Sequence, residues 1–195
     1  MVATSSTMIP IGFDAPDFSL EDTLSGKTFN FPDKKSSKAY LLCFICNHCP
    51  YVIHIIEHLT QQCNQWTQKD ISVTMISAND PVKYPADSPA KMKELATSQG
   101  FSFPYLFDAD QNVAKSYKAA CTPDFFLFDR SKKLFYRGQY DGARPGKSDP
   151  INGSDLKNAM SLLLSGKSPP EKQIPSLGCN IKWKENNEPD YFGAR

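Results

Sequence analysis

The chain has 195 residues, and its 22 basic side chains nearly balance its 21 acidic ones, giving a net charge of +1. Hydrophobic residues make up 40% of the chain and aromatic residues 12%, which is enough to fill a core and excludes disorder over most of the length. The near-neutral charge argues against a nucleic-acid partner, and the length favours one domain with additions over two full domains.

The composition also bears on the compartment. The longest uninterrupted apolar run, residues 39–46, is far shorter than the roughly 20 residues of a membrane-spanning helix. Residues 1–10 contain no basic residue followed by an apolar stretch, so they do not resemble a secretory signal. We therefore expect a cytoplasmic protein without a membrane partner. Six cysteines in such a compartment are more often core residues, catalytic thiols or metal ligands than structural disulfides.

The first third of the chain predicts a hairpin, a strand and a helix. Short apolar segments at 18–20 and 28–31 flank a turn and predict an N-terminal hairpin. The run 39–46 predicts a strand that is buried on both faces. A helix follows, with Pro50 in its first turn, where the missing N–H is not needed. Its apolar residues recur at helical spacing: Val52, Ile55, Ile56, Leu59, Cys63 and Trp66.

The middle of the chain carries a second strand and a well-delimited helix. Residues 71–77 predict the strand, and a loop with two prolines follows at 79–86. Ser88 then caps a helix that has Pro89 at its first position and stops at Gly100.

The last third predicts two helices and a second hairpin. A short helix is expected over 110–117, and residues 125–129 and 134–139 predict the hairpin. Apolar residues between 156 and 164 indicate an amphipathic helix that Gly166 ends.

We divide the chain into an N-terminal arm (1–11), a domain (12–166) and a C-terminal tail (167–195). The element order contains one parallel crossover followed by an antiparallel pair, so the fold class is α/β. We expect a central mixed sheet flanked by helices, with an N-terminal β-hairpin extension and a C-terminal tail. Apolar residues in the tail favour packing on the domain over disorder; they are Ile174, Leu177, Ile181 and Trp183.

The strongest chemical signal is the segment from Cys46 to Pro50, Cys-Asn-His-Cys-Pro, which joins the buried strand to its helix. Thiols at a helix N-terminus meet unpaired N–H groups and the positive end of the helix dipole, which favour a thiolate. A protonated His48 would lower the thiol pKa further. Two intervening residues let the thiols of Cys46 and Cys49 cycle between dithiol and disulfide, with no cofactor besides that redox-active disulfide.

Metal binding is the competing interpretation of the same residues. We assign no metal ligand, because a zinc site would need a second C-x-x-C, or recruitment of His54, His58 or Cys43 by the fold. A copper carrier stays open as an alternative, since Cys46 and Cys49 with His48 offer soft ligands for Cu(I).

Four segments resemble the thioredoxin-like superfamily, and more closely its alkyl hydroperoxide reductase and thiol-specific antioxidant (AhpC/TSA) branch. They are residues 12–20, 41–52, 121–129 and 175–184, which together span nearly the whole chain. The resemblance implies a thioredoxin-like fold with a cis Thr122-Pro123 bond beside the C-x-x-C motif. It also implies that the Thr122 backbone pairs with an extended peptide substrate. Cys121 would lie near the active pair, either as an auxiliary thiol or as a small buried residue.

The sequence departs from the family patterns in three places. No P-x-x-x-T/S-x-x-C loop of the peroxiredoxin kind precedes Cys46 or Cys49, and the arginine that peroxiredoxins place just before the strand near Phe125 is missing. Tyr40 stands where thioredoxins carry a buried carboxylate. The C-x-H-C pattern is more similar to disulfide-forming oxidases, so an unusually acidic Cys46 is expected.

These observations favour a thiol-disulfide oxidoreductase. An exposed Cys46 attacks a protein or small-molecule disulfide, and a buried Cys49 resolves the mixed disulfide. A thiol compound that the sequence does not identify supplies the electrons. The alternatives are a peroxiredoxin-like peroxidase that reduces hydroperoxides, and the metal carrier described above.

The remaining cysteines and histidines have simpler interpretations. Cys179 in the tail is a second candidate auxiliary thiol, provided that the tail folds over the site. Cys43 and Cys63 are predicted to lie in the core, and His54 and His58 are predicted to be solvated because they fall off the apolar stripe of their helix.

Overall fold

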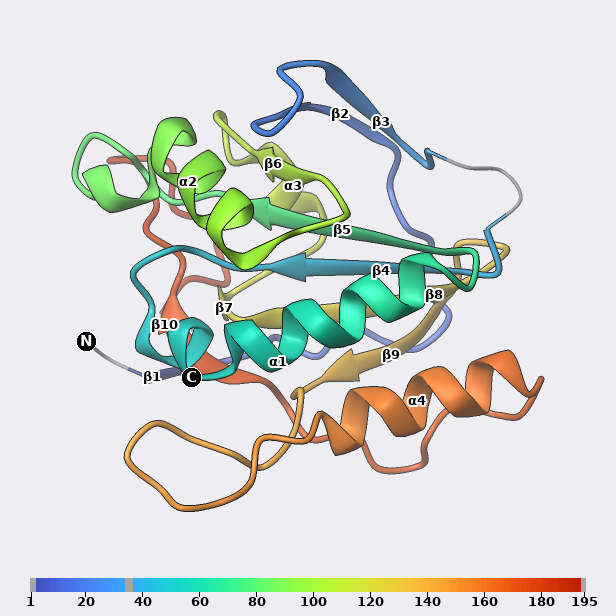
Figure 1. The fold of residues 1–195 in the computed structure, drawn as a ribbon. Helices are drawn as coiled ribbons and strands as arrows, with labels where there is room; N and C mark the ends of the chain where they lie inside the picture. The colour runs from blue at the N-terminus through green and yellow to red at the C-terminus, as the bar shows by residue number, and fades with distance from the viewer. Residues whose placement is uncertain (1–2, 34–36, 194–195) are drawn as a thin grey trace.

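The computed structural model describes residues 3–33 and 37–193. Its centre is a seven-stranded mixed sheet with the order β3-β2-β6-β5-β4-β8-β9 (Figure 1). The strands are β2 (Phe18–Asp22), β3 (Thr28–Phe31), β4 (Ala39–Phe44), β5 (Ile71–Ser77), β6 (Tyr105–Phe107), β8 (Asp124–Asp129) and β9 (Leu134–Gly138). β4, β5 and β6 pair in parallel, and the other neighbours pair antiparallel.

A second, small sheet joins segments that are far apart in the sequence. In it β10 (Leu177–Asn180) lies between β1 (Ala3–Ser5) and β7 (Cys121–Thr122), with antiparallel pairing on both sides. The C-terminal tail thereby packs against both the N-terminal arm and the segment that precedes Pro123.

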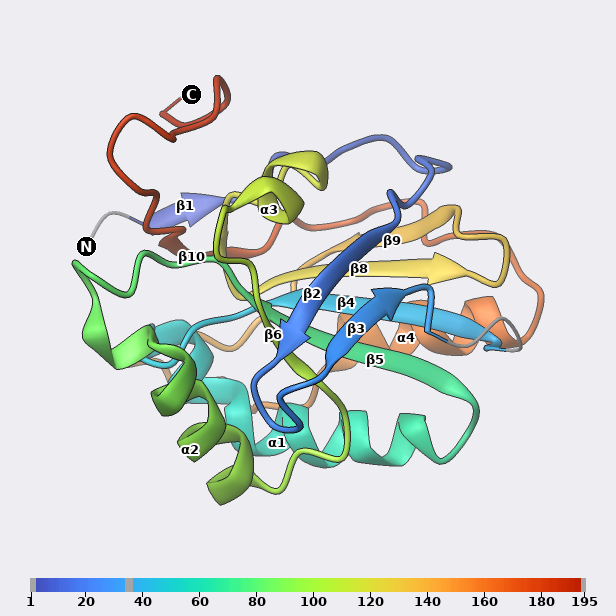
Figure 2. The same cartoon turned by 90° about the horizontal axis from the view of Figure 1, so that it is seen from above.

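Helices cover both faces of the large sheet (Figure 2). They are α1 (Pro50–Thr67), α2 (Pro89–Gln99), α3 (Asn112–Ser116) and α4 (Ser154–Leu164), with a 3₁₀ turn η1 (Pro85–Asp87) before α2. Alternate residues of β4 enter two cores because successive side chains of a strand point to opposite faces. Leu41 packs in the core with α1, α2 and α4, whereas Leu42 packs in the core with α3 and part of the tail.

Most elements confirm the sequence predictions. The two hairpins, β2–β3 and β8–β9, are antiparallel pairs, and β4 is buried along its whole length. Helix α2 begins after Ser88 with Pro89 at its first position, and Gly100 ends it with φ +72°, in the left-handed region where a glycine avoids the Cβ penalty. Gly166 likewise follows α4 with φ +67°.

The structure adds elements that the sequence did not predict. β6 gives the sheet a second parallel crossover, through α2, where we expected one. The short strands β1, β7 and β10 were also missed, and α3 occupies only part of the expected range 110–117. Among the described residues, no helix has the length and apolar character needed to cross a bilayer.

Candidate active site

The two cysteines of the C-x-x-C motif lie where β4 passes into α1. The extended chain continues past Phe44, because the Ile45 N–H still donates to Ile76 O at 2.9 Å. Cys49 is the N-cap residue of α1, and its carbonyl accepts the first helical hydrogen bond from the Ile53 N–H. All six cysteines are free thiols. Cys46 is 1% exposed and Cys49 0%, so the prediction of an exposed Cys46 is wrong.

Thr122 faces both sulfurs from the opposite side of the site. The Thr122-Pro123 peptide bond is cis, which confirms the prediction. Cys46 Sγ lies 3.4 Å from Thr122 Oγ1, and the Cys49 thiol donates to Thr122 O at 3.0 Å. A single residue, far from the motif in sequence, thus contacts both members of the pair.

The two thiols hydrogen-bond to each other and therefore titrate as a pair. The hydrogen bond from Cys46 lowers the pKa of Cys49 to about 5, and further hydrogen bonds from Thr122 and Cys179 act in the same direction against burial. The same bond to Cys49 raises the pKa of Cys46 well above its ordinary value, helped by burial and by the charge of Asp87. The expectation of an unusually acidic Cys46 is wrong, because the lowered pKa falls on Cys49.

A buried carboxylate that sequence analysis missed holds the residues between the cysteines. Asp87, in η1, is fully buried and accepts hydrogen bonds from the Asn47 N–H at 2.8 Å and from Asn79 Nδ2 at 2.7 Å. Its Oδ2 also lies 2.6 Å from His48 Nδ1. The His48 ring stacks on Tyr84, with centroids 5.4 Å apart and planes within 3°. The loop after β5 therefore fixes His48 beside the thiols.

The same loop creates a group of candidate metal ligands. One ligand atom each from Cys46, His48 and Asp87 lies within 4.8 Å of the others. This set differs from the Cys46, Cys49 and His48 combination that the sequence suggested, because Cys49 faces Thr122 instead.

The C-terminal tail covers the backbone of Thr122. Cys179 of β10 is the register partner of Thr122, so the edge that we expected to pair with a peptide substrate pairs with the chain's own tail. Cys179 is 2% exposed and packs in the same core as Cys46 and Cys49. A hydrogen bond joins its side chain to Cys49.

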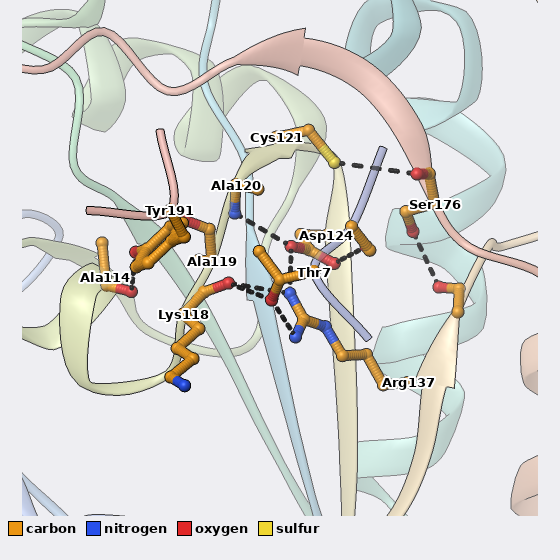
Figure 3. A network of polar contacts seen from close by, with 12 residues as sticks. Thr7, Ala114, Lys118, Ala119, Ala120, Cys121, Asp124, Arg137, Ser176 and Tyr191 are labelled. Carbon is orange, nitrogen blue, oxygen red and sulfur yellow. Dashed lines mark hydrogen bonds and ion pairs between the residues drawn. The ribbon is translucent and has the colours of Figure 1, made fainter. Parts of the chain in front are cut away.

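A buried ion pair supports the segment on both sides of Pro123 (Figure 3). Asp124 and Arg137 are both fully buried and meet at 3.1 Å. Asp124 also accepts hydrogen bonds from Ser6 Oγ and the Ala120 N–H, and Arg137 donates to Thr7 Oγ1 at 2.6 Å. The N-terminal arm is thereby tied to the loop that carries Thr122.

The other sequence candidates occupy less reactive positions. Cys43 and Cys63 are fully buried, which confirms that they are core residues. Cys121 is buried as well, and its thiol points to Pro123 O at 3.6 Å and Ser176 O at 3.9 Å. Both His54 and His58 are half-buried, and His58 Nδ1 lies 2.6 Å from the Tyr140 hydroxyl, so the prediction of solvated histidines is wrong.

Comparisons with known proteins identify the family and the fold. The profile of the AhpC/TSA family matches residues 11–137, which is more than half of the chain. The chain belongs to the AhpC/TSA family. Two solved structures are similar over almost the whole chain. An uncharacterized conserved protein from Geobacillus kaustophilus is 46% identical, with a TM-score of 0.92, and the match covers 95% of this chain and 98% of that one. A hypothetical protein from Sinorhizobium meliloti 1021 is 42% identical, with a TM-score of 0.91 and coverages of 94% and 100%.

More distant structures show the fold of this AhpC/TSA member. The thioredoxin domain of a thiol-disulfide oxidoreductase from Bacteroides vulgatus has a TM-score of 0.61 at 18% identity, covering 80% of this chain and 99% of that one. The α/β fold with a central mixed sheet is therefore thioredoxin-like, as the resemblance implied. A search of curated proteins finds no match.

Proposed function

We propose that this AhpC/TSA protein is a thiol-disulfide oxidoreductase whose redox pair is Cys46 and Cys49. The observation that carries the proposal is the contact of both sulfurs with Thr122, next to the cis bond, while they hydrogen-bond to each other at the start of α1. The two sulfurs need little movement to form a disulfide. The pair also loses its first proton readily, because the pKa of Cys49 is lowered.

Both sulfurs are buried, so their neighbours decide which thiol attacks first. Cys49 is enclosed by the Thr122 carbonyl and by Cys179 of β10. Cys46 instead lies beside His48, whose side chain is 22% exposed. The charge rests mainly on Cys49, whose pKa is the lower one, and Cys46 attacks from the minor population in which its proton has passed along the shared hydrogen bond to Cys49.

The reaction then follows thiol-disulfide exchange. The Cys46 thiolate attacks one sulfur of a substrate disulfide, and the other sulfur leaves as a thiolate that takes a proton. Cys49 next attacks Cys46 Sγ, which closes the Cys46–Cys49 disulfide and releases the second substrate thiol. His48, held by Asp87, is placed to donate a proton to a leaving thiolate. An external thiol compound returns the pair to the dithiol.

The test compares alanine variants in the reduction of hydroxyethyl disulfide and of insulin. We expect Cys46→Ala to lose more than 99% of the activity, and Cys49→Ala to accumulate a mixed disulfide on Cys46 that mass spectrometry detects. Cys63→Ala is the matched control, because Cys63 lies in the same helix within the core. Equal activity in all three variants contradicts the proposal. A redox titration gives the direction: a midpoint near about −270 mV marks a reductant, and one near about −120 mV an oxidant.

Peroxide reduction is the second candidate, and the AhpC/TSA match favours it. Fast peroxidases need donors aimed at the breaking O–O bond. The guanidinium of Arg137 instead faces Asp124 and Thr7, so we expect turnover of hydrogen peroxide to be slower than disulfide exchange. Peroxide turnover that survives Cys49→Ala but not Cys46→Ala would favour the peroxidase.

A metal carrier is the third candidate, and the cluster of Cys46, His48 and Asp87 favours it. A thiolate, an imidazole and a carboxylate suit zinc better than Cu(I), which prefers softer ligands. Protein purified without chelators would then retain about one metal ion per chain. Asp87→Asn would release that ion, whereas Cys49→Ala would keep it. A protein that retains no metal contradicts this candidate.

A further inference from the structure

Cys179 is held beside the redox pair by pairing on both edges of its strand. On one side it is the register partner of Thr122, and on the other side it pairs with Ala3. The chain is also fastened before and after it. Ser176 Oγ donates to Gly138 O at 2.7 Å, and the Lys182 N–H donates to Asn79 Oδ1 at 2.8 Å. The position of the thiol is therefore fixed by long-range contacts.

The neighbouring glycine lets β10 approach Thr122 unusually closely. A Cβ at Gly178 would stand 2.0 Å from the Thr122 carbonyl oxygen, far inside any real contact. That same carbonyl accepts the hydrogen bond from the Cys49 thiol. The close approach brings Cys179 to Cys49, whose sulfur accepts hydrogen bonds from both the side chain and the backbone of Cys179.

Cys121 offers a comparison within the same site. It is also buried and lies near enough to Cys49 for their charges to interact. Its thiol, however, points to the carbonyl oxygens of Pro123 and Ser176, the second of which Figure 3 shows. Of these two extra thiols, only Cys179 hydrogen-bonds to Cys49.

We propose that Cys179 is a third redox thiol of this site, which accepts the disulfide from the Cys46–Cys49 pair. The inference rests on the proposed function and extends its cycle by one exchange. Cys179 loses its proton and attacks Cys49 Sγ. The Cys46–Cys49 bond breaks, the Cys49–Cys179 bond forms, and Cys46 leaves as a thiolate that takes up the proton. The exchange is isoelectronic and needs no further oxidant.

The state of Cys49 controls when this exchange occurs. In the dithiol form, burial together with the hydrogen bond to Cys49 and the charge of Cys49 raises the pKa of Cys179 to about 12. A Cys49 that is part of a disulfide carries no charge. Its hydrogen bond and its charge therefore no longer raise the pKa of Cys179 once the pair is oxidised. The nearby charge of Lys182, which lowers the pKa of Cys179, remains. Cys179 thus becomes a better nucleophile when there is a disulfide to accept.

The experiment maps thiols and disulfides in the full-length protein after one equivalent of glutathione disulfide. Free thiols are alkylated under acid quench, and linked peptides are identified by mass spectrometry. We expect oxidised wild type to contain both the Cys46–Cys49 and the Cys49–Cys179 disulfide. In the molecules with Cys49–Cys179, Cys46 is a free thiol, so the amount of alkylated Cys46 should equal the amount of that disulfide. Cys179→Ser should contain Cys46–Cys49 alone, with no alkylated Cys46 in the oxidised fraction.

Two glycine variants test the geometry without touching a thiol. Gly178→Ala presses on the Thr122 carbonyl and forces β10 away from it, so we expect the ratio of Cys49–Cys179 to Cys46–Cys49 product to fall at least tenfold below that of wild type, and an unchanged ratio contradicts the inference. Gly142→Ala is the matched control, because a Cβ there meets nothing within 4 Å. Circular dichroism verifies that each variant is folded.

The possible outcomes separate the two proposals. A wild-type protein that forms Cys46–Cys49 but never Cys49–Cys179 overturns the inference and leaves the proposed function standing. Linkage of Cys49 to Cys121 in place of Cys179 overturns the inference too. A wild-type protein in which neither disulfide forms overturns both.

Discussion

Replacement of Asp87 by asparagine tests the buried carboxylate that organises the site. The side chain keeps its size but loses its charge, and one of its two oxygens becomes an amide nitrogen. Whichever way the amide turns, it can no longer accept hydrogen bonds on both sides, from the Asn47 N–H and from Asn79 Nδ2. One buried donor is therefore left facing another donor.

The expected loss of stability follows from these contacts. A hydrogen bond to a charged group contributes about 1.5–3 kcal/mol, and an unsatisfied buried donor costs a similar amount. Asp87 is fully buried, so solvent screens neither effect. We expect Asp87→Asn to lower the free energy of unfolding by about 3 kcal/mol, which corresponds to a Tm lower by roughly 6–12 °C for a chain of this length.

A second measurement follows the thiols. The charge of Asp87 is one of the causes that raise the pKa of Cys46, so its removal should lower that pKa. Urea denaturation of the reduced protein gives the stability, and thiolate absorbance at about 240 nm against pH gives the pKa. Asp80→Asn is the control, because it lies in the same loop and changes the net charge equally. If Asp87→Asn changes neither quantity beyond this control, our account of the carboxylate is refuted.

Three further predictions concern the pair and its support. Cys46→Ala removes the main donor to Cys49, so the pKa of Cys49 should rise above about 5 in the same absorbance titration; an unchanged value contradicts the shared hydrogen bond. A thiol whose pKa is lower in the folded protein than in the unfolded chain stabilises the fold at pH values above that lowered pKa. The free energy of unfolding of reduced wild type should therefore exceed that of Cys49→Ala by an amount that shrinks as the pH falls from 8 to 5, measured by urea denaturation. A constant difference argues against the lowered pKa. Arg137→Met leaves Asp124 buried and unpaired, at a cost of about 3–5 kcal/mol, and Asp124→Asn in the same chain should recover part of it; no recovery means that the ion pair is not the cause.

Local signals in the sequence were sufficient for the elements that carry the redox pair. The continuous apolar run predicted β4, and helical spacing with Pro50 predicted α1, so the position of Cys46 and Cys49 at their junction followed. Pro89 and Gly100 marked the ends of α2, because a proline at the first position and a left-handed glycine at the last depend on local backbone conformation; the predicted cap by the Ser88 side chain is absent, since that side chain makes no capping hydrogen bond.

Features that depend on distant parts of the chain could not be predicted in this way. β7 and β10 are two and four residues long and have no period of their own; they are strands because they pair with each other. The low pKa of Cys49 was missed as well: its largest cause, the hydrogen bond from Cys46, is local, but the further hydrogen bonds from Thr122 and Cys179 come from distant parts of the chain.

One signal for Asp87 was present in the sequence. The Cys46 segment follows β4, and the Asp87 loop follows β5. Parallel neighbours bring their carboxyl ends to the same edge of the sheet, where sites in α/β folds form. Extending the loop interpretation one residue beyond 79–86 would have placed a carboxylate beside His48.

The pairing of β10 with Thr122 sets a condition on any polypeptide substrate. An extended peptide that uses the Thr122 backbone competes with the protein's own tail, and it binds only the fraction of molecules in which β10 has separated. If that separation costs about 3 kcal/mol, the apparent dissociation constant for the peptide rises by a factor of about 150. A small disulfide needs no strand pairing, so this penalty discriminates between sizes of substrate before any chemistry takes place.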